Sequence, residues 1–116
     1  MYKPGLHVLL ELETSNSTLL TDAESARQFF KKKIKEYGLN ALGEVYHTFD
    51  NKAFTATVCL TESHLAIHTW PEFNRLTFDI FLSNYQHVND GIARNLAKDV
   101  MAYFEATSHT IQEVKR

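Results

Sequence analysis

The sequence predicts an α+β fold, a two-layer sandwich in which two helices cover one face of a largely antiparallel sheet. Most segments alternate polar and apolar residues, as half-buried strands do, and only two segments have helical spacing. Their order is βαββ followed by ββαβ, and no linker or low-complexity tract separates the halves. We therefore expect a single domain over residues 1–116.

The first half reads as strand, helix, strand, strand. Residues 6–13 alternate with period two. Residues 22–37 have helical spacing, and a Thr21–Glu24 capping-box pattern and Gly38 mark the two ends of that helix. Two β-branched or alternating segments follow, at residues 41–50 and 53–60, and both are predicted to be strands.

The second half repeats this alternation. Residues 64–70 form a strand that Pro71 ends, and residues 75–83 form the next strand. Asn89 or Asp90 can cap the second helix. Its apolar face is formed by Ile92, Leu96, Val100 and Phe104. The last short strand is expected at residues 109–114.

Composition excludes several classes of protein. Hydrophobic residues make up 44% and charged residues 22% of the 116, as in an ordinary soluble domain. No apolar run approaches the ~20 residues of a membrane span, and we expect neither a signal peptide nor a membrane partner. A net charge of −2 argues against nucleic acid. The single cysteine, Cys59, fits a reducing cytoplasm.

The chemistry-bearing segment is ESHLAIHTWPE, residues 62–72. Ser63 and His68 can support acyl chemistry if the two side chains meet in space, although most serines near histidines are structural. A metal site is not expected here. His64 and His68 share a strand face, but the strand rise separates them by ~13 Å, too far to bind one zinc ion.

Residues 62–72 resemble the cleavage-site motif of the S-adenosylmethionine decarboxylase proenzyme family in its short bacterial and archaeal form. The resemblance covers nearly the whole chain. Its other motifs are Gly5-Leu6-His7 with Glu11, Val45-Tyr46-His47-Thr48-Phe49, and Asp79-Ile80-Phe81. It implies an enzyme that makes its own pyruvoyl cofactor, and a homodimer of cleaved protomers with residues from both chains near each site. Pairing also suits a short chain with a modest core.

The resemblance implies self-cleavage between Glu62 and Ser63. Ser63 Oγ would attack the Glu62 carbonyl, and Thr55 stands where the family carries the serine hydroxyl that donates to the oxyanion. His68 matches the base that removes the Ser63 α-proton, so that the resulting ester leaves by elimination. Loss of ammonia then leaves a pyruvoyl group, whose carbonyl forms a Schiff base with the substrate and accepts electrons as the carboxylate leaves. The products would be residues 1–62 and 63–116.

The resemblance also assigns substrate-binding residues. Phe49 matches an aromatic residue that stacks on adenine, and His68 is similar to the residue covering the other face of that ring. Glu72 matches the acid that binds the ribose hydroxyls, and Glu11 is expected near the charged end of the substrate. The alternatives are a core position for Phe49 and solvated surface positions for the two glutamates.

One position departs from the family pattern. Ser83 stands where the family has the cysteine that protonates the product, and a serine hydroxyl is a much weaker acid than a thiol. Spacing favours none of the possible replacements. These are His47, Tyr85, His87, Cys59 (otherwise a small buried residue) and water.

Three functions follow as expectations. The first is an S-adenosylmethionine decarboxylase that makes the aminopropyl donor for spermidine synthesis. The second, motivated by Ser83, is a pyruvoyl-dependent decarboxylase of ornithine or arginine. The third is a homologue that does not cleave itself and only binds a ligand or a partner.

Overall fold

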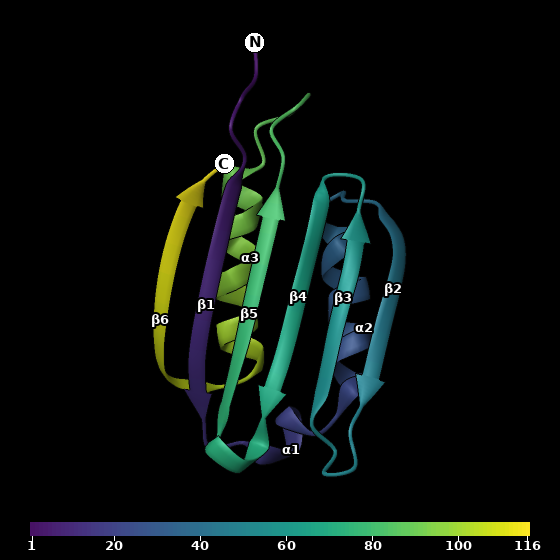
Figure 1. The fold of residues 1–116 in the computed structure, drawn as a ribbon, viewed down its shortest axis with the longest axis vertical. Coiled ribbons are helices and arrows are strands. Elements are labelled where there is room, and N and C mark those ends of the chain that lie inside the picture. Colours follow the sequence, from purple (N-terminus) through teal and green to yellow (C-terminus); the bar gives the residue numbers. More distant parts are fainter.

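The computed structural model describes all residues from 1 to 116 and confirms the α+β sandwich. Six strands form one sheet, and the helices lie on one of its faces (Figure 1). The elements are β1 (Leu6–Thr14), α1 (Ser17–Leu20), α2 (Ala23–Glu36), β2 (Ala41–Thr48), β3 (Phe54–Leu60), β4 (Ser63–Trp70), a 3-10 turn η1 (Pro71–Phe73), β5 (Arg75–Leu82), α3 (Asp90–Tyr103) and β6 (Ala106–Lys115).

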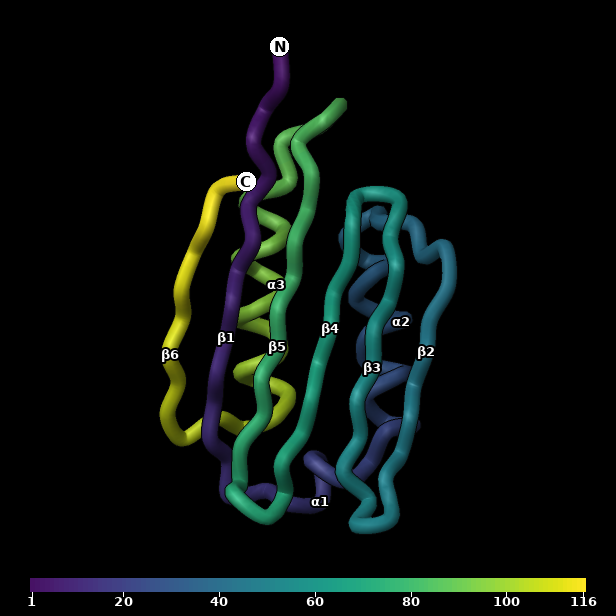
Figure 2. The backbone as a smooth tube through the Cα atoms, in the orientation of Figure 1, coloured from purple at the N-terminus to yellow at the C-terminus, as the bar shows by residue number.

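The sheet has the strand order β2-β3-β4-β5-β1-β6, and all neighbouring strands are antiparallel. The first strand of the chain therefore lies between β5 and β6, and the two halves of the sequence share one sheet. The C-terminus lies beside the beginning of β1, and the first residues of the chain extend beyond it (Figure 2). Gly5 and Arg116 exchange two backbone hydrogen bonds there, of 2.7 and 3.0 Å.

The hydrophobic core lies between the sheet and helices α2 and α3. In β1 the residues Leu6, Val8, Leu10 and Leu12 are buried, while the residues between them lie on the other side. Phe30 of α2 stacks on Phe78 of β5 with ring centroids 5.8 Å apart. We call the side of the sheet that no helix covers the open face. No helix is both long and apolar enough to cross a membrane.

The start of α2 differs from the predicted capping box. Asp22 is the N-cap, and its carboxylate accepts a hydrogen bond of 3.0 Å from the Ser25 backbone N–H. Thr21 is unavailable because it ends the short helix α1, where its hydroxyl donates to carbonyl groups of that helix. The prediction that Thr21 and Glu24 form a capping box was therefore wrong, and α1 itself was missed.

The residue at the start of α3 also differs in its role from the predicted cap. Asn89 occupies the N-cap position but makes no capping hydrogen bond. Its side-chain amide instead donates to the Ser83 carbonyl at 2.8 Å, and its backbone N–H donates to Asn84 Oδ1 at 2.6 Å. These bonds fix the segment that follows β5.

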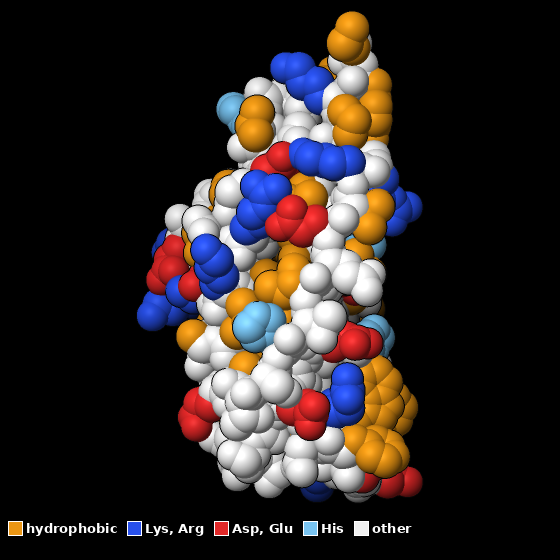
Figure 3. All heavy atoms as spheres, turned by 90° about the vertical axis from the view of Figure 1, so that its left-hand side faces the viewer, with side chains coloured by type: hydrophobic (Ala, Val, Ile, Leu, Met, Phe, Trp, Pro, Cys, Tyr) orange, Lys and Arg blue, Asp and Glu red, His pale blue; other side chains and the backbone are white.

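Strand β6 is longer than the predicted 109–114 and forms one edge of the sheet. Figure 3 views this edge, where basic and acidic side chains lie beside each other. Arg94 of α3 forms two hydrogen bonds with the Glu113 carboxylate, of 2.8 and 2.9 Å, and Lys115 pairs with Asp90. The ion pairs tie α3 to the edge strand.

Candidate active site

The predicted cleavage bond lies in the tight turn between β3 and β4. Leu60 and Ser63 are register partners, so only Thr61 and Glu62 separate the two strands. Ser63 has a φ of 146°, which a residue with a side chain rarely adopts. Such a conformation costs about 1–3 kcal/mol and is found where surrounding structure enforces it. The Glu62–Ser63 junction is therefore strained.

The backbone of Ser83 contacts this junction. Its N–H donates a hydrogen bond of 2.7 Å to the Glu62 carbonyl oxygen. Gly5 packs closely against the same segment, since a Cβ at Gly5 would lie 2.5 Å from the Leu82 carbonyl oxygen. No sequence pattern indicates this backbone donor, because every residue except proline has an N–H.

Four other predicted residues meet at the opposite end of the β3–β4 hairpin. Phe49, Thr55, His68 and Glu72 line one cavity of about 430 Å³. The Thr55 hydroxyl is hydrogen-bonded to His68 Nδ1, and Asn51 Nδ2 donates to Glu72 Oε2 at 3.1 Å. Phe49 is 49% exposed, so it is not a core residue. These residues form a cavity suited to a flat ring with polar groups.

The Glu62–Ser63 junction and the cavity residues at the other end of the hairpin are well separated within one chain. Ser63 begins β4 and His68 lies five residues further along it. At about 3.3 Å per residue this places them roughly 16 Å apart. Thr55 is the register partner of His68, so it lies at the same distant level. Neither side chain reaches the Glu62–Ser63 bond of its own chain.

Glu11 lies on the open face at the level of His68. Its register partner on β5 is Thr77, which in turn is opposite His68 on β4. The Glu11 carboxylate is paired with Arg75 at 3.7 Å. The structure therefore groups Glu11 with the His68 end of the sheet.

The possible replacements for the missing cysteine are scattered. Tyr85 and His87 are exposed in the segment after β5. The His47 ring contacts the Phe49 ring, with centroids 4.6 Å apart. Cys59 is exposed on the open face rather than buried, and its register partner is His64.

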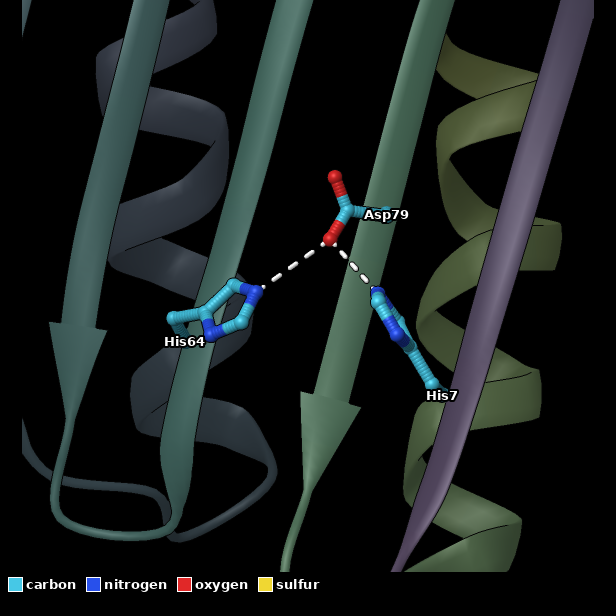
Figure 4. A group of neighbouring side chains, drawn as sticks. All are labelled: His7, His64 and Asp79. Carbon is cyan, nitrogen blue, oxygen red and sulfur yellow. Dashed lines mark hydrogen bonds and ion pairs between the residues drawn. The ribbon is translucent and has the colours of Figure 1, made fainter. Parts of the chain in front are cut away.

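A third group was not predicted. His7, His64 and Asp79 come together on the open face from strands β1, β4 and β5 (Figure 4). Both histidine Nε2 atoms lie near Asp79 Oδ2, at 2.8 and 3.2 Å. Strand alternation places each residue on the open face, but only the register of three strands shows that they meet.

The S-adenosylmethionine decarboxylase family model matches residues 6–116. The chain belongs to this family. The S-adenosylmethionine decarboxylase proenzyme of Thermodesulfovibrio yellowstonii is 32% identical over 116 residues, which cover 100% of this chain and 83% of the relative. That of Pelotomaculum thermopropionicum is 33% identical over 112 residues, 97% of this chain and 86% of the relative.

The fold supports the same family. The crystal structure of the adenosylmethionine decarboxylase from Aquifex aeolicus superposes with a TM-score of 0.84 at 25% identity, covering 100% of this chain and 92% of that one. The resemblance inferred from residues 62–72 is thus confirmed. Because these relatives are all S-adenosylmethionine decarboxylases, the comparisons do not favour the ornithine, arginine or binding-only alternatives.

Proposed function

We propose that this member of the S-adenosylmethionine decarboxylase family cleaves itself between Glu62 and Ser63 and then decarboxylates S-adenosylmethionine with a pyruvoyl group derived from Ser63. The decarboxylated product would serve as the aminopropyl donor for spermidine synthesis. The observation that carries the cleavage proposal is the strained turn at Ser63, with the Ser83 N–H bonded to the Glu62 carbonyl.

Cleavage begins with attack of Ser63 Oγ on the Glu62 carbonyl carbon. Negative charge then develops on the Glu62 oxygen, where the Ser83 N–H is already 2.7 Å away. A donor held at that oxygen stabilises the transition state without reorganisation. The C–N bond breaks as the ester forms, which releases the strain at the φ of 146°. These features support Ser63 as the pyruvoyl precursor.

Removal of the Ser63 α-proton completes the cleavage. Elimination releases Glu62 as a carboxylate, and addition of water with loss of ammonia leaves the pyruvoyl group on residue 63. His68 is the base of this proposal, and the Thr55 hydroxyl bonded to its ring orients it or donates to the oxyanion. Both lie roughly 16 Å along the strand from the Ser63 of their own chain.

We therefore propose that a second copy supplies Thr55 and His68. A two-fold interface between open faces would place each His68 over the Ser63 of the other copy and create two equivalent sites. The open face carries large apolar side chains that are exposed in the single chain, which favours burial against a partner. They are Leu9, Val45, Trp70 and Val114.

The same interface would complete the substrate site. A pyruvoyl group at position 63 would supply a carbonyl that binds the substrate amine and withdraws electrons as carbon dioxide leaves. Phe49 offers an exposed ring for adenine and Glu72 a carboxylate for the ribose hydroxyls. Glu11 stays a proposed contact for the charged end of the substrate. The free, exposed Cys59 fits a cytoplasmic location.

Release of carbon dioxide from carboxyl-labelled substrates tests this function. We expect release from S-adenosylmethionine and none above background from ornithine or arginine. The Ser63→Ala variant, which has no nucleophile at the cleavage bond, should stay uncut and inactive. Release from ornithine or arginine alone would refute the substrate assignment, and a wild-type chain that stays uncut would refute the cleavage proposal.

A further inference from the structure

The group formed by His7, Asp79 and His64 lies one residue along β4 from the proposed cleavage bond. His64 follows Ser63 directly, and its register partner on β5 is Phe81. The side chains are half-buried, with exposures of 13% for His7, 27% for Asp79 and 37% for His64. Helices cover the other face, so a substrate bound at position 63 would approach from the open face on which this group lies.

The hydrogen bonds fix the proton on His7. Arg116 can only donate, so its guanidinium donates to His7 Nδ1 at 3.2 Å, and that nitrogen carries no proton. The proton of the neutral ring is therefore on Nε2, which donates to Asp79 Oδ2 at 2.8 Å. Arg116 also lies over the Phe81 ring, 5.1 Å from its centroid.

Asp79 in turn orients His64. The same carboxylate oxygen accepts a hydrogen bond from His64 Nε2 at 3.2 Å. This bond leaves His64 Nδ1 as the ring nitrogen that does not face Asp79, on the most exposed side chain of the three (Figure 4). A histidine held by a carboxylate on one nitrogen and open on the other is a common arrangement of acid–base residues.

We propose that His64 is the acid that protonates the substrate α-carbon after decarboxylation, and that Asp79 and His7 are positioning residues that hold its ring. The inference rests on the proposed function and assigns the role that the Ser83 hydroxyl is too weak an acid to perform. The bond from the α-carbon to the carboxylate breaks, carbon dioxide leaves, and the electron pair takes the Nδ1 proton of a His64 imidazolium, whose Nε2–H stays on Asp79. A proton from solvent then restores the imidazolium.

Metal binding is the competing use of the same three residues. Their ligand atoms lie within 4.8 Å of one another, and two histidines with one carboxylate can bind a transition metal. A metal on His7 Nε2 would move the ring proton to Nδ1, which would then face the Arg116 donor. Metal-bound histidines instead direct that N–H at an acceptor. The hydrogen bonds therefore favour the acid–base role.

The His64→Gln variant tests the proposal, because glutamine can still donate to Asp79 but has no acidic proton. Cleaved protein is incubated with S-adenosylmethionine, and the intact mass of chain 63–116 is followed during turnover. When the α-carbon is not protonated, the proton goes to carbon 2 of residue 63. Hydrolysis then leaves alanine on the chain and releases the substrate carbon as an aldehyde, so the substrate nitrogen stays on residue 63.

We expect His64→Gln to convert most of chain 63–116 to the alanine form within few turnovers, so that carbon dioxide release stops early while the wild type continues to turn over. Adding Ser83→Cys to His64→Gln, which supplies a thiol near the site, should lower the alanine fraction again. His109→Gln changes an exposed histidine on β6 in the same way and should match the wild type. An alanine fraction equal to that of the wild type in His64→Gln would overturn the proposal.

Two further variants and one binding measurement keep the test decisive. If His64→Gln fails to cleave, Asp79→Asn retains His64 and should still raise the alanine fraction at an unchanged melting temperature. A rise in Cys59→Ser but not in the His64 or Asp79 variants would assign the acid to the thiol and overturn the proposal. The proposal would also be overturned if the wild type bound zinc stoichiometrically and His64→Gln abolished that binding. A wild type without pyruvoyl mass or carbon dioxide release would instead refute the proposed function.

Discussion

The backbone N–H of Ser83 donates a 2.7 Å hydrogen bond to the carbonyl oxygen of Glu62. This bond joins the end of β5 to the turn before β4, one residue before Ser63, whose φ of 146° marks local strain. Ser83 therefore has a contact with the proposed cleavage bond that does not depend on its side chain. A serine in place of the cysteine that the resemblance leads us to expect therefore leaves that contact unchanged.

Ser83→Pro removes the N–H, whereas Ser83→Ala keeps it. Loss of one oxyanion donor costs about 10²–10³ in rate, so we expect Ser83→Pro to cleave at least 100-fold more slowly. Leu82, the preceding residue, is already in a strand, which suits a residue before proline. Cleavage is followed by gel electrophoresis, with circular dichroism to check folding. Equal cleavage by folded Ser83→Pro and Ser83→Ala would contradict the role of the N–H.

Co-expression of Ser63→Ala with His68→Ala tests whether two copies share one site. Each variant alone should stay uncut. In a mixed dimer, the His68→Ala chain keeps its Ser63 and meets an intact His68 from the other chain, so this chain alone should be cleaved. A different tag on each variant allows mass spectrometry to show which of the two chains is cleaved. No cleavage in a demonstrated mixed dimer would indicate that His68 acts within its own chain or not at all.

Glu72→Gln and Phe49→Ala should weaken substrate binding without affecting cleavage. A lost hydrogen bond to a charged group costs about 1.5–3 kcal/mol, which predicts a KM raised by roughly 10- to 150-fold in Glu72→Gln. A lost stacking partner costs about 1–3 kcal/mol, which predicts a KM raised by roughly 5- to 150-fold in Phe49→Ala. Steady-state kinetics on fully cleaved enzyme measures this. Lys52→Ala, an exposed turn residue, is the control. An unchanged KM in both variants would remove this cavity from the substrate site.

The interactions of Asp90 are expected to make the free energy of unfolding depend on pH in the acidic range. The hydrogen bond from Lys115, helped by Asn84, holds the pKa of the Asp90 carboxyl below its ordinary value of 3.8. Because the folded-state pKa is the lower one, this stabilisation is present above pH 3.8 and is lost as the pH falls through the folded-state pKa.

The Asp90→Asn variant should therefore lose less stability on acidification. Between pH 6 and pH 3 the drop in the free energy of unfolding should be smaller than in the wild type by about 1 kcal/mol or less. Urea unfolding at the two pH values measures the difference, with Asp50→Asn in an exposed turn as the control. Equal pH dependence of Asp90→Asn and the wild type would rule out this contribution.

Most of the fold could be predicted from alternation and helical spacing, because the four central strands β1, β3, β4 and β5 each have one face on the core. The alternation of β1 is an example, with Leu6 buried and His7 on the open face. The helix α1 was missed because a helix of four residues contains too little periodicity. The N-cap of α2 was placed one residue early, since sequence alone does not show that Thr21 is already used by α1.

The site residues inferred from the sequence stay predictions, and the sequence did not reveal how they are arranged. The strand rise that excluded a metal shared by His64 and His68 also separates Ser63 from His68, and it predicts that one chain cannot hold the whole site. The group of His7, His64 and Asp79 depends on the pairing of β1 and β4 with β5, which no local pattern reveals. The Ser83 N–H depends on backbone geometry alone.

The intact mass of the purified protein, measured beside the Ser63→Ala variant, tests the central claim most directly. We expect two wild-type chains, residues 1–62 and 63–116, with the second lighter by one ammonia than simple hydrolysis would make it. The variant should remain a single chain. A wild-type chain that stays uncut and matches the variant in its stability over days would contradict self-cleavage at Glu62–Ser63 and the pyruvoyl enzyme that follows from it.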